Sequence, residues 1–178
     1  PGADGQKTLF HEYFHAVQLA HIFSEDRAKR DELKGPIWFH EGGAEYMAQY
    51  GSRNARLSST LQQVNAEGRW PFVFEEKMEQ KMRHGLEKML SACPGVSMKD
   101  ITYENRCDGA GYDIGAWAHA YLASKFGHDV LLDTYYAKLD ELGWEDAFIE
   151  TYGMTTDEFY GEFDAFLQLP LSEQIAIL

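Results

Sequence analysis

The chain has 178 residues, of which 44% are hydrophobic and 14% aromatic, a composition typical of one folded domain with a sizeable core. Its formal net charge of −13 argues against a nucleic-acid partner and against binding to anionic membranes, because like charges repel. No apolar run is long enough to span a bilayer and no signal peptide opens the chain, so membrane insertion is not expected. Because residue 1 is proline rather than methionine, we expect a processed or excised part of a longer chain.

The first predicted element is a helix from Thr8 to about Phe23, after a short leading loop. It contains His11-Glu12-x-x-His15, and histidines four residues apart lie on one helical face, where both imidazoles can reach one metal ion. The glutamate beside the first histidine can take a proton from a metal-bound water. The pattern predicts a zinc hydrolase; the alternative is an amphipathic core helix whose histidines only satisfy local hydrogen bonds.

A second helix is expected over residues 37–50, opened by Pro36 in its first turn. The polar stretch Ser24–Gly35 before it has no apolar periodicity and is interpreted as an exposed connection. Within the second helix, Gly42 and Gly43 would each cost about 1 kcal/mol relative to alanine unless another element packs very close. Close approach to the first helix is the expected reason for the pair.

Glu41 is the best candidate for a third metal ligand. Two histidines and one carboxylate leave zinc an open fourth position for water, which is the arrangement of a catalytic site. Glu45 lies one turn later and can accept a hydrogen bond from the free ring N–H of a ligand histidine. Either glutamate alone is simply interpreted as an exposed helix carboxylate. Their joint occurrence beside Trp38 and Phe39 favours a site.

The middle of the chain carries helical patterns at residues 53–66 and 72–92, the second with a methionine stripe more typical of a core than of a ligand site. Residues 93–111 form the longest irregular stretch and are placed like a loop beside an active site. Cys93 and Cys107 flank that loop without zinc-ligand spacing. A disulfide and two free thiols both remain open at this point.

Further helices are expected over residues 112–126, 130–142, 144–152 and 156–167, the last after a capping box at Thr155–Glu158. No repeat and no convincing alternating run for a sheet is present, so the predicted fold class is mainly α. We expect one domain in three parts, with zinc-site helices at 1–51, variable helices and a loop at 52–110, and a C-terminal helical part at 111–178.

The segments HEYFH and WFHEGGAEY together resemble the gluzincins, the thermolysin-like and aminopeptidase-like zinc metallopeptidases. The resemblance implies His11, His15 and Glu41 as zinc ligands, Glu12 as general base, and Glu45 as the hydrogen-bond partner of a ligand histidine. It implies one zinc ion per chain and a peptide or protein substrate. Two departures are a histidine before the ligand glutamate, where asparagine is common, and a longer spacing, with 25 residues between His15 and Glu41.

The segment Tyr112-Asp113-Ile114-Gly115-Ala116 resembles the stretch in which the aminopeptidase-like branch carries its catalytic tyrosine at the start of a helix. Tyr112 is therefore the candidate donor to the oxyanion that develops during amide hydrolysis. His119, two turns later, is a minor candidate because a lone histidine among apolar residues is more often packed than catalytic.

Two functions remain after the resemblance is considered. In the first, the chain is a zinc metallopeptidase in which Glu12 assists the attack of a zinc-bound water on a peptide bond. In the second, it is a zincin-like module that binds zinc or a partner without catalysis, because the substrate-binding sheet that precedes the first motif in gluzincins is small or missing here. A ferritin-like di-iron bundle is excluded, since no second Glu-x-x-His occurs. The compartment is not determined, with a secreted or cell-envelope location favoured.

Overall fold

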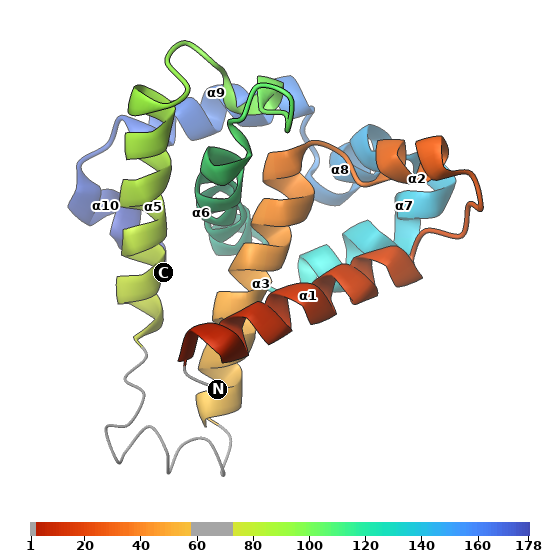
Figure 1. Cartoon of the computed structure of the whole chain (residues 1–178), viewed down its shortest axis with the longest axis horizontal. Helices are drawn as coiled ribbons and strands as arrows, with labels where there is room; N and C mark the ends of the chain where they lie inside the picture. Colours follow the sequence, from red (N-terminus) through yellow and green to blue (C-terminus); the bar gives the residue numbers. More distant parts are fainter. Residues whose placement is uncertain (1–2, 58–72) are drawn as a thin grey trace.

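Helix α3 (Ile37–Leu57) lies at the centre of the fold, and α6 (Asp108–Phe126) and α1 (Ala3–Ala20) both pack extensively on it. Figure 1 shows α1 running obliquely across α3, with α5 (Phe74–Ser91) on the far side of α6. The structure is a computed structural model that describes residues 3–57 and 73–178. These residues form helices and connections but no strand, so the mainly α class is confirmed for the described part of the chain.

The remaining elements are short and follow the chain around this centre. They are α2 (Arg27–Leu33), the 3-10 helix η1 (Met98–Asp100), the π-helix η2 (Leu131–Tyr135), α7 (Tyr136–Leu142), α8 (Trp144–Tyr152), α9 (Thr156–Leu167) and α10 (Leu171–Ile175). The capping box predicted before α9 is confirmed, because the Thr155 side chain accepts from the Glu158 amide while the Glu158 carboxylate accepts from the Thr155 amide. None of the described helices is long and apolar enough to cross a membrane.

In the first 35 residues, the structure confirms that Ser24–Gly35 is largely exposed but differs from the predicted elements in two places. The leading loop is helical from Ala3, and α1 ends at Ala20 rather than near Phe23. The supposed connection at Ser24–Gly35 contains α2, which begins because the Asp26 carboxylate accepts hydrogen bonds from the first amides of the helix. Only one residue of α2, Leu33, is buried, and a single apolar contact gives no periodicity to detect.

The glycine pair of α3 permits close approach to α6, not to α1 as expected. A Cβ added at Gly42 would lie 2.4 Å from the backbone of Gly115 on α6, and one added at Gly43 would meet the His119 ring at 3.1 Å. In the opposite direction, a Cβ at Gly115 would lie 2.2 Å from the Trp38 carbonyl oxygen. The two helices therefore cross with their backbones in contact next to Glu41.

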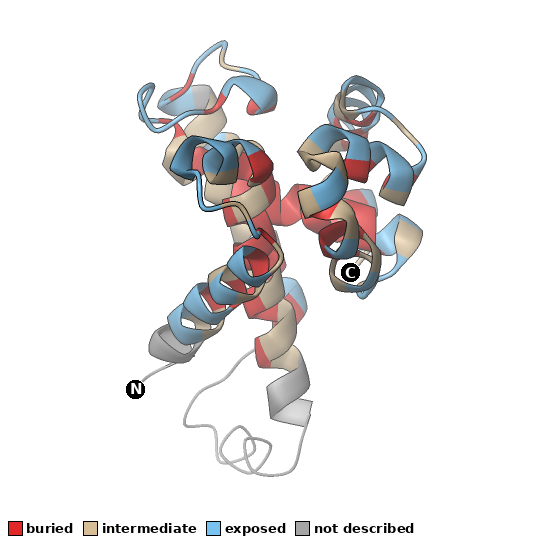
Figure 2. Cartoon of the chain, turned by 90° about the vertical axis from the view of Figure 1, so that its right-hand side faces the viewer, coloured by how far each residue is buried: buried red, intermediate tan, exposed pale blue. Residues whose placement is uncertain are grey.

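The core lies along α3 and α6 and is rich in aromatic rings. Figure 2 shows buried residues concentrated along these helices, whereas much of the outer side of α1 is exposed. Trp38 is fully buried, stacks on Phe159 at 5.2 Å between ring centroids, and donates from its indole to the Tyr160 hydroxyl at 3.0 Å. Met78 and Met82 of α5 are also fully buried, which confirms the methionine stripe as core. Of the helix predicted over residues 53–66, the first part continues α3, and residues 58–66 lie outside the described part of the chain.

Candidate metal centre

Helices α1 and α3 bring the three predicted ligands together. The Nε2 atoms of His11 and His15 are 3.0 Å apart, and Glu41 Oε2 lies 3.1 Å from the His15 nitrogen and 3.4 Å from the His11 nitrogen. His11 and Glu41 are buried, and His15 is half-buried. The crossing of α1 over α3 thus joins donors that are far apart in sequence into one triangle.

The size of this triangle suits a transition metal. Nitrogen and oxygen donors bind zinc at about 2.0–2.1 Å, so two donors at tetrahedral positions are about 3.3 Å apart. The three donor separations, 3.0, 3.1 and 3.4 Å, are close to that edge length. Two imidazoles and one carboxylate also match the donor preference of zinc better than that of calcium or magnesium, which favour all-oxygen sites.

His15 is oriented by Gln18, a residue that the sequence analysis did not single out. The Gln18 amide nitrogen donates to the His40 carbonyl at 2.9 Å and to the Tyr136 hydroxyl at 2.8 Å, so its carbonyl oxygen faces His15. That oxygen lies 2.6 Å from His15 Nδ1, which must therefore carry a proton. The arrangement leaves Nε2 free to bind a metal. The position of Gln18 one turn after His15 is the sequence signal that could have identified it.

His11 contacts two of the predicted supporting residues. Its Nδ1 lies 3.2 Å from Glu45 Oε2. The Tyr112 ring stacks on the His11 imidazole, with centroids 5.8 Å apart and planes 11° from parallel. Tyr112 lies one turn inside α6, because the helix begins at Asp108 rather than at the tyrosine. Both contacts restrict the rotation of the first histidine.

A partly buried ion-pair network, which was not predicted from the sequence, holds Glu45. The Lys81 ammonium lies 2.7 Å from the Glu45 carboxylate and 2.8 Å from that of Asp113, and Lys7 donates to Glu45 at 2.9 Å. Lys88 completes the network with a 2.5 Å contact to Asp113. Burial raises the pKa of Glu45, but His11 and Lys81 lower it by more, so the carboxylate stays ionised. Lys7 comes from α1, in the segment expected to be a leading loop, and Lys81 and Lys88 come from α5.

The two oxygens of Glu41 have different partners. Oε2 faces the two ligand histidines, whereas Oε1 accepts a 2.7 Å hydrogen bond from the Tyr103 hydroxyl and lies 3.3 Å from His40 Nε2. Burial raises the pKa of Glu41, but the histidines and Tyr103 together hold it well below its usual range. Burial and the Glu41 carboxylate raise the pKa of Tyr103 to about 12, so the phenol keeps its proton and donates.

The neighbouring carboxylates also raise the pKa values of His11 and His15. Burial lowers the pKa of His11, but Glu41 and Glu45 raise it by more, to about 9. Burial also lowers the pKa of His15, but its hydrogen bonds to Glu41 and Gln18 raise that pKa by more. The same carboxylates that attract protons to this cluster would attract a divalent cation in their place.

Two cavities are lined by residues of the cluster. The larger, of about 750 Å³, includes His15, His40, Glu41 and Tyr103 in its lining. The smaller, of about 340 Å³, includes Lys7, His11, Glu45 and Tyr112. Glu12 is exposed on α1 and lines neither of these two cavities. The structure thus joins the three predicted ligands with Glu45 and Tyr112, and leaves Glu12 facing solvent beside them.

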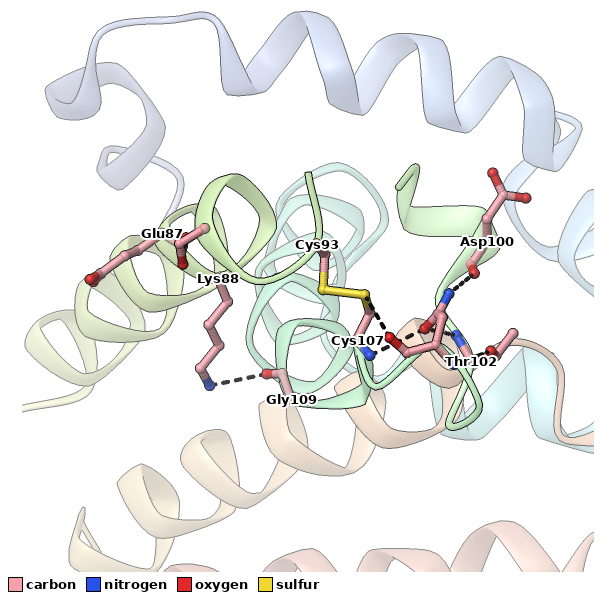
Figure 3. Close-up of a disulfide and its surroundings, with 9 residues drawn as sticks. Glu87, Lys88, Cys93, Asp100, Thr102, Cys107 and Gly109 are labelled. Atoms are coloured by element: carbon pink, nitrogen blue, oxygen red, sulfur yellow. Dashed lines mark hydrogen bonds between the residues drawn. A yellow bond between two sulfur atoms is a disulfide. The ribbon is translucent and has the colours of Figure 1, made fainter. Parts of the chain in front are cut away.

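The loop between α5 and α6 is closed by a disulfide, which the sequence left open. Cys93 follows the end of α5 and Cys107 precedes α6, with their Cα atoms 5.8 Å apart (Figure 3). Both cysteines are buried. The loop between them carries Tyr103 to Glu41, so the irregular stretch does lie beside the cluster, as predicted.

His119 lies in the core and not in the cluster of His11, His15 and Glu41. It is buried and donates from Nε2 to the Phe39 carbonyl at 2.9 Å. Burial lowers its pKa to about 4, against the opposing effect of the Phe39 carbonyl. The folded chain therefore keeps this ring neutral at pH values where the unfolded chain protonates it.

This burial predicts a loss of stability in mild acid. Because the unfolded state binds a proton to His119 near its usual pKa of 6.5 and the folded state only near 4, stability is full above pH 6.5 and falls below it. Between pH 6.5 and 5, protonation of His119 in the unfolded chain is expected to lower the free energy of unfolding by about 2 kcal/mol. Urea denaturation in the presence of chelator measures it, and His119→Gln should show a flatter profile. Equal slopes for the two chains would contradict the prediction.

Comparisons with protein-family models, with curated proteins and with solved structures found no match. The cluster is therefore interpreted from its own geometry and donor chemistry.

Proposed function

We propose that the chain is a zinc metallopeptidase of the gluzincin type, which hydrolyses peptide bonds. The observation that carries the proposal is the triangle of His11, His15 and Glu41 donors at zinc-like separations. The hydrolytic part rests on the sequence pattern, because Glu12 stands next to the first ligand at the position where gluzincins have their base. A purely structural zinc site would have no need of that carboxylate.

Each residue of the cluster has a role in the proposed reaction. Zinc, when bound by the two histidines and Glu41, would lower the pKa of water and polarise the substrate carbonyl. Glu12 takes the proton of the attacking water and passes it to the leaving amine. Tyr112 donates a hydrogen bond to the developing oxyanion, and burial together with the nearby Glu41 raises its pKa, so the hydroxyl stays protonated. The two cavities lined by residues of the cluster provide space for the two halves of a peptide.

The second candidate is a zincin-like module that binds zinc or a partner without catalysis. One observation favours it, namely that Glu12 is exposed and lines neither of the two cavities beside the cluster. In this case the chain binds zinc through the same three ligands but does not turn over peptides. The two candidates therefore differ in activity and agree in metal content.

Metal analysis and peptide digestion test the proposal together. We expect one zinc ion per chain, and we expect a diverse peptide mixture to be cut by the zinc-loaded chain but not by the chelated chain. Mass spectrometry of the products gives the cut positions. His15→Gln should lose the zinc, whereas His21→Gln, a histidine just beyond the end of α1 and outside the cluster, should keep it.

Three results would count against the proposal. A chain without stoichiometric zinc, or one that prefers iron in the same two-histidine, one-carboxylate site, would refute the zinc assignment. Full zinc content in the His15→Gln variant would show that other groups hold the ion. Stoichiometric zinc without any cut peptide would support the non-catalytic module instead.

A further inference from the structure

We propose that Tyr103 is a positioning residue that presents a single oxygen of Glu41 to the metal, and that the Cys93–Cys107 disulfide keeps it there. The inference rests on the proposed metal site. It adds a residue that the gluzincin resemblance does not assign, and it makes metal affinity depend on the oxidation state of two cysteines.

The two oxygens of Glu41 differ in what they contact. A carboxylate can bind a metal through one oxygen or through both. Here Oε1 accepts the Tyr103 hydroxyl at 2.7 Å and faces His40 at 3.3 Å, so its lone pairs are directed away from the ligand histidines. Oε2 lies within 3.4 Å of both the His11 and the His15 nitrogens. Tyr103 therefore favours binding through one oxygen, which leaves more of the metal's coordination sphere for water and substrate.

Hydrogen bonds within the loop hold Tyr103 in place. The Asn105 side-chain oxygen accepts hydrogen bonds from the amides of Thr102 and Cys107, both at 3.1 Å, and its amide nitrogen donates to the Asp100 carbonyl at 2.8 Å. The Thr102 hydroxyl oxygen in turn accepts a hydrogen bond from the backbone N–H of Asn105 at 3.2 Å. Tyr103 sits inside this turn. One asparagine thus fixes the backbone on both sides of the tyrosine.

The disulfide attaches that turn to the rest of the protein. Figure 3 shows the disulfide joining the end of α5 to the start of α6, with Thr102 and Asp100 in the loop that it closes. Asn105 bonds directly to the amide of Cys107, so the turn is anchored at one of the two bridged residues. Breaking the disulfide would free this anchor and give the loop many more conformations. The Tyr103 hydroxyl would then spend less time on Glu41.

Zinc affinity measured by competition with a chromophoric chelator tests the proposal without relying on activity. Tyr103→Phe removes only the hydroxyl of a side chain that is 52% exposed, so the variant should fold normally. We expect its zinc affinity to fall about 10-fold, as is typical when a partner of a metal ligand is removed. Tyr121→Phe is the matched control, because it removes a hydroxyl that bonds Glu162 of α9, and neither residue belongs to the cluster. Its affinity should be unchanged.

The double variant Cys93→Ser, Cys107→Ser tests the role of the disulfide. We expect weaker zinc binding, and we expect Tyr103→Phe to have little further effect in this background, because both changes act through the same hydrogen bond. Equal zinc affinity of the Tyr103→Phe and unchanged chains would overturn the positioning role. Fully additive effects would overturn the link to the disulfide. An unchanged chain that binds no zinc would refute the proposed function itself.

Discussion

Replacing Glu12 by glutamine is expected to reduce peptide hydrolysis by at least about 10³-fold while the chain keeps its zinc. The amide has the same shape as the carboxylate but cannot take a proton from water, and general base catalysis typically contributes about 10²–10⁴-fold. Zinc should stay because Glu12 is exposed and stands outside the triangle of ligands. The turnover number for a peptide found in the digestion screen, measured alongside zinc content, gives both quantities.

A matched exchange outside α1 turns this into a specific test. Glu25 is an exposed carboxylate after the end of α1, so Glu25→Gln makes the same chemical change away from the ligands and should leave turnover as it was. Near-full activity in Glu12→Gln would show that the base has been assigned wrongly. Loss of zinc in that variant would instead mean that Glu12 supports the metal rather than the reaction.

The largest expected loss of stability comes from Gly115→Ala. An added Cβ would lie 2.2 Å from the Trp38 carbonyl oxygen and 2.9 Å from the Gly42 Cα, and neither backbone atom can move aside without shifting a whole helix. We expect the free energy of unfolding to fall by about 3 kcal/mol or more. Thermal and urea denaturation in the presence of chelator measure this loss independently of the metal.

Gly161→Ala provides the control, because it makes the same change inside α9, where nothing lies within 4 Å of the added Cβ. This variant should be unchanged or more stable by up to about 1 kcal/mol, since alanine favours helix more than glycine does. Similar stabilities for the two alanine variants would show that α3 and α6 are not in backbone contact.

Much of the helical layout followed from the sequence because local signals define helix ends. Thr155 and Glu158 predicted the start of α9, and the expected bounds of α8, Trp144–Tyr152, agree with the structure. The methionines of α5 are in the core at the expected spacing. What failed depended on contacts between distant segments. The sequence did not reveal that Gly42 packs on α6 rather than on α1. A glycine in a helix indicates that another element packs closely, but it does not indicate which element.

The candidate site shows the same difference between local signals, which a sequence reveals, and contacts between distant segments, which it does not. The two histidines and Glu41 could be predicted because residue type and spacing along two helices are both visible in a sequence. Gln18 carried a weak signal through its position after His15, but its role depends on Tyr136, which is 118 residues away. Tyr103 carried no signal of its own. Its hydroxyl bonds Glu41 from a loop that also contains the Asn105 turn and is closed by the disulfide, and none of these contacts is visible in the sequence.

The backbone contact between α3 and α6 limits which parts of the candidate site can move. Glu41 directly precedes Gly42, so this ligand cannot shift unless two helices slide against each other and open the core. The α1 side is different, because Leu9 and Tyr13 are each 67% exposed and have no such packing on their outer face. In the proposed peptidase, adjustment to substrates of different size would therefore fall to α1, because Glu41 and the disulfide-closed Tyr103 loop are both held in place.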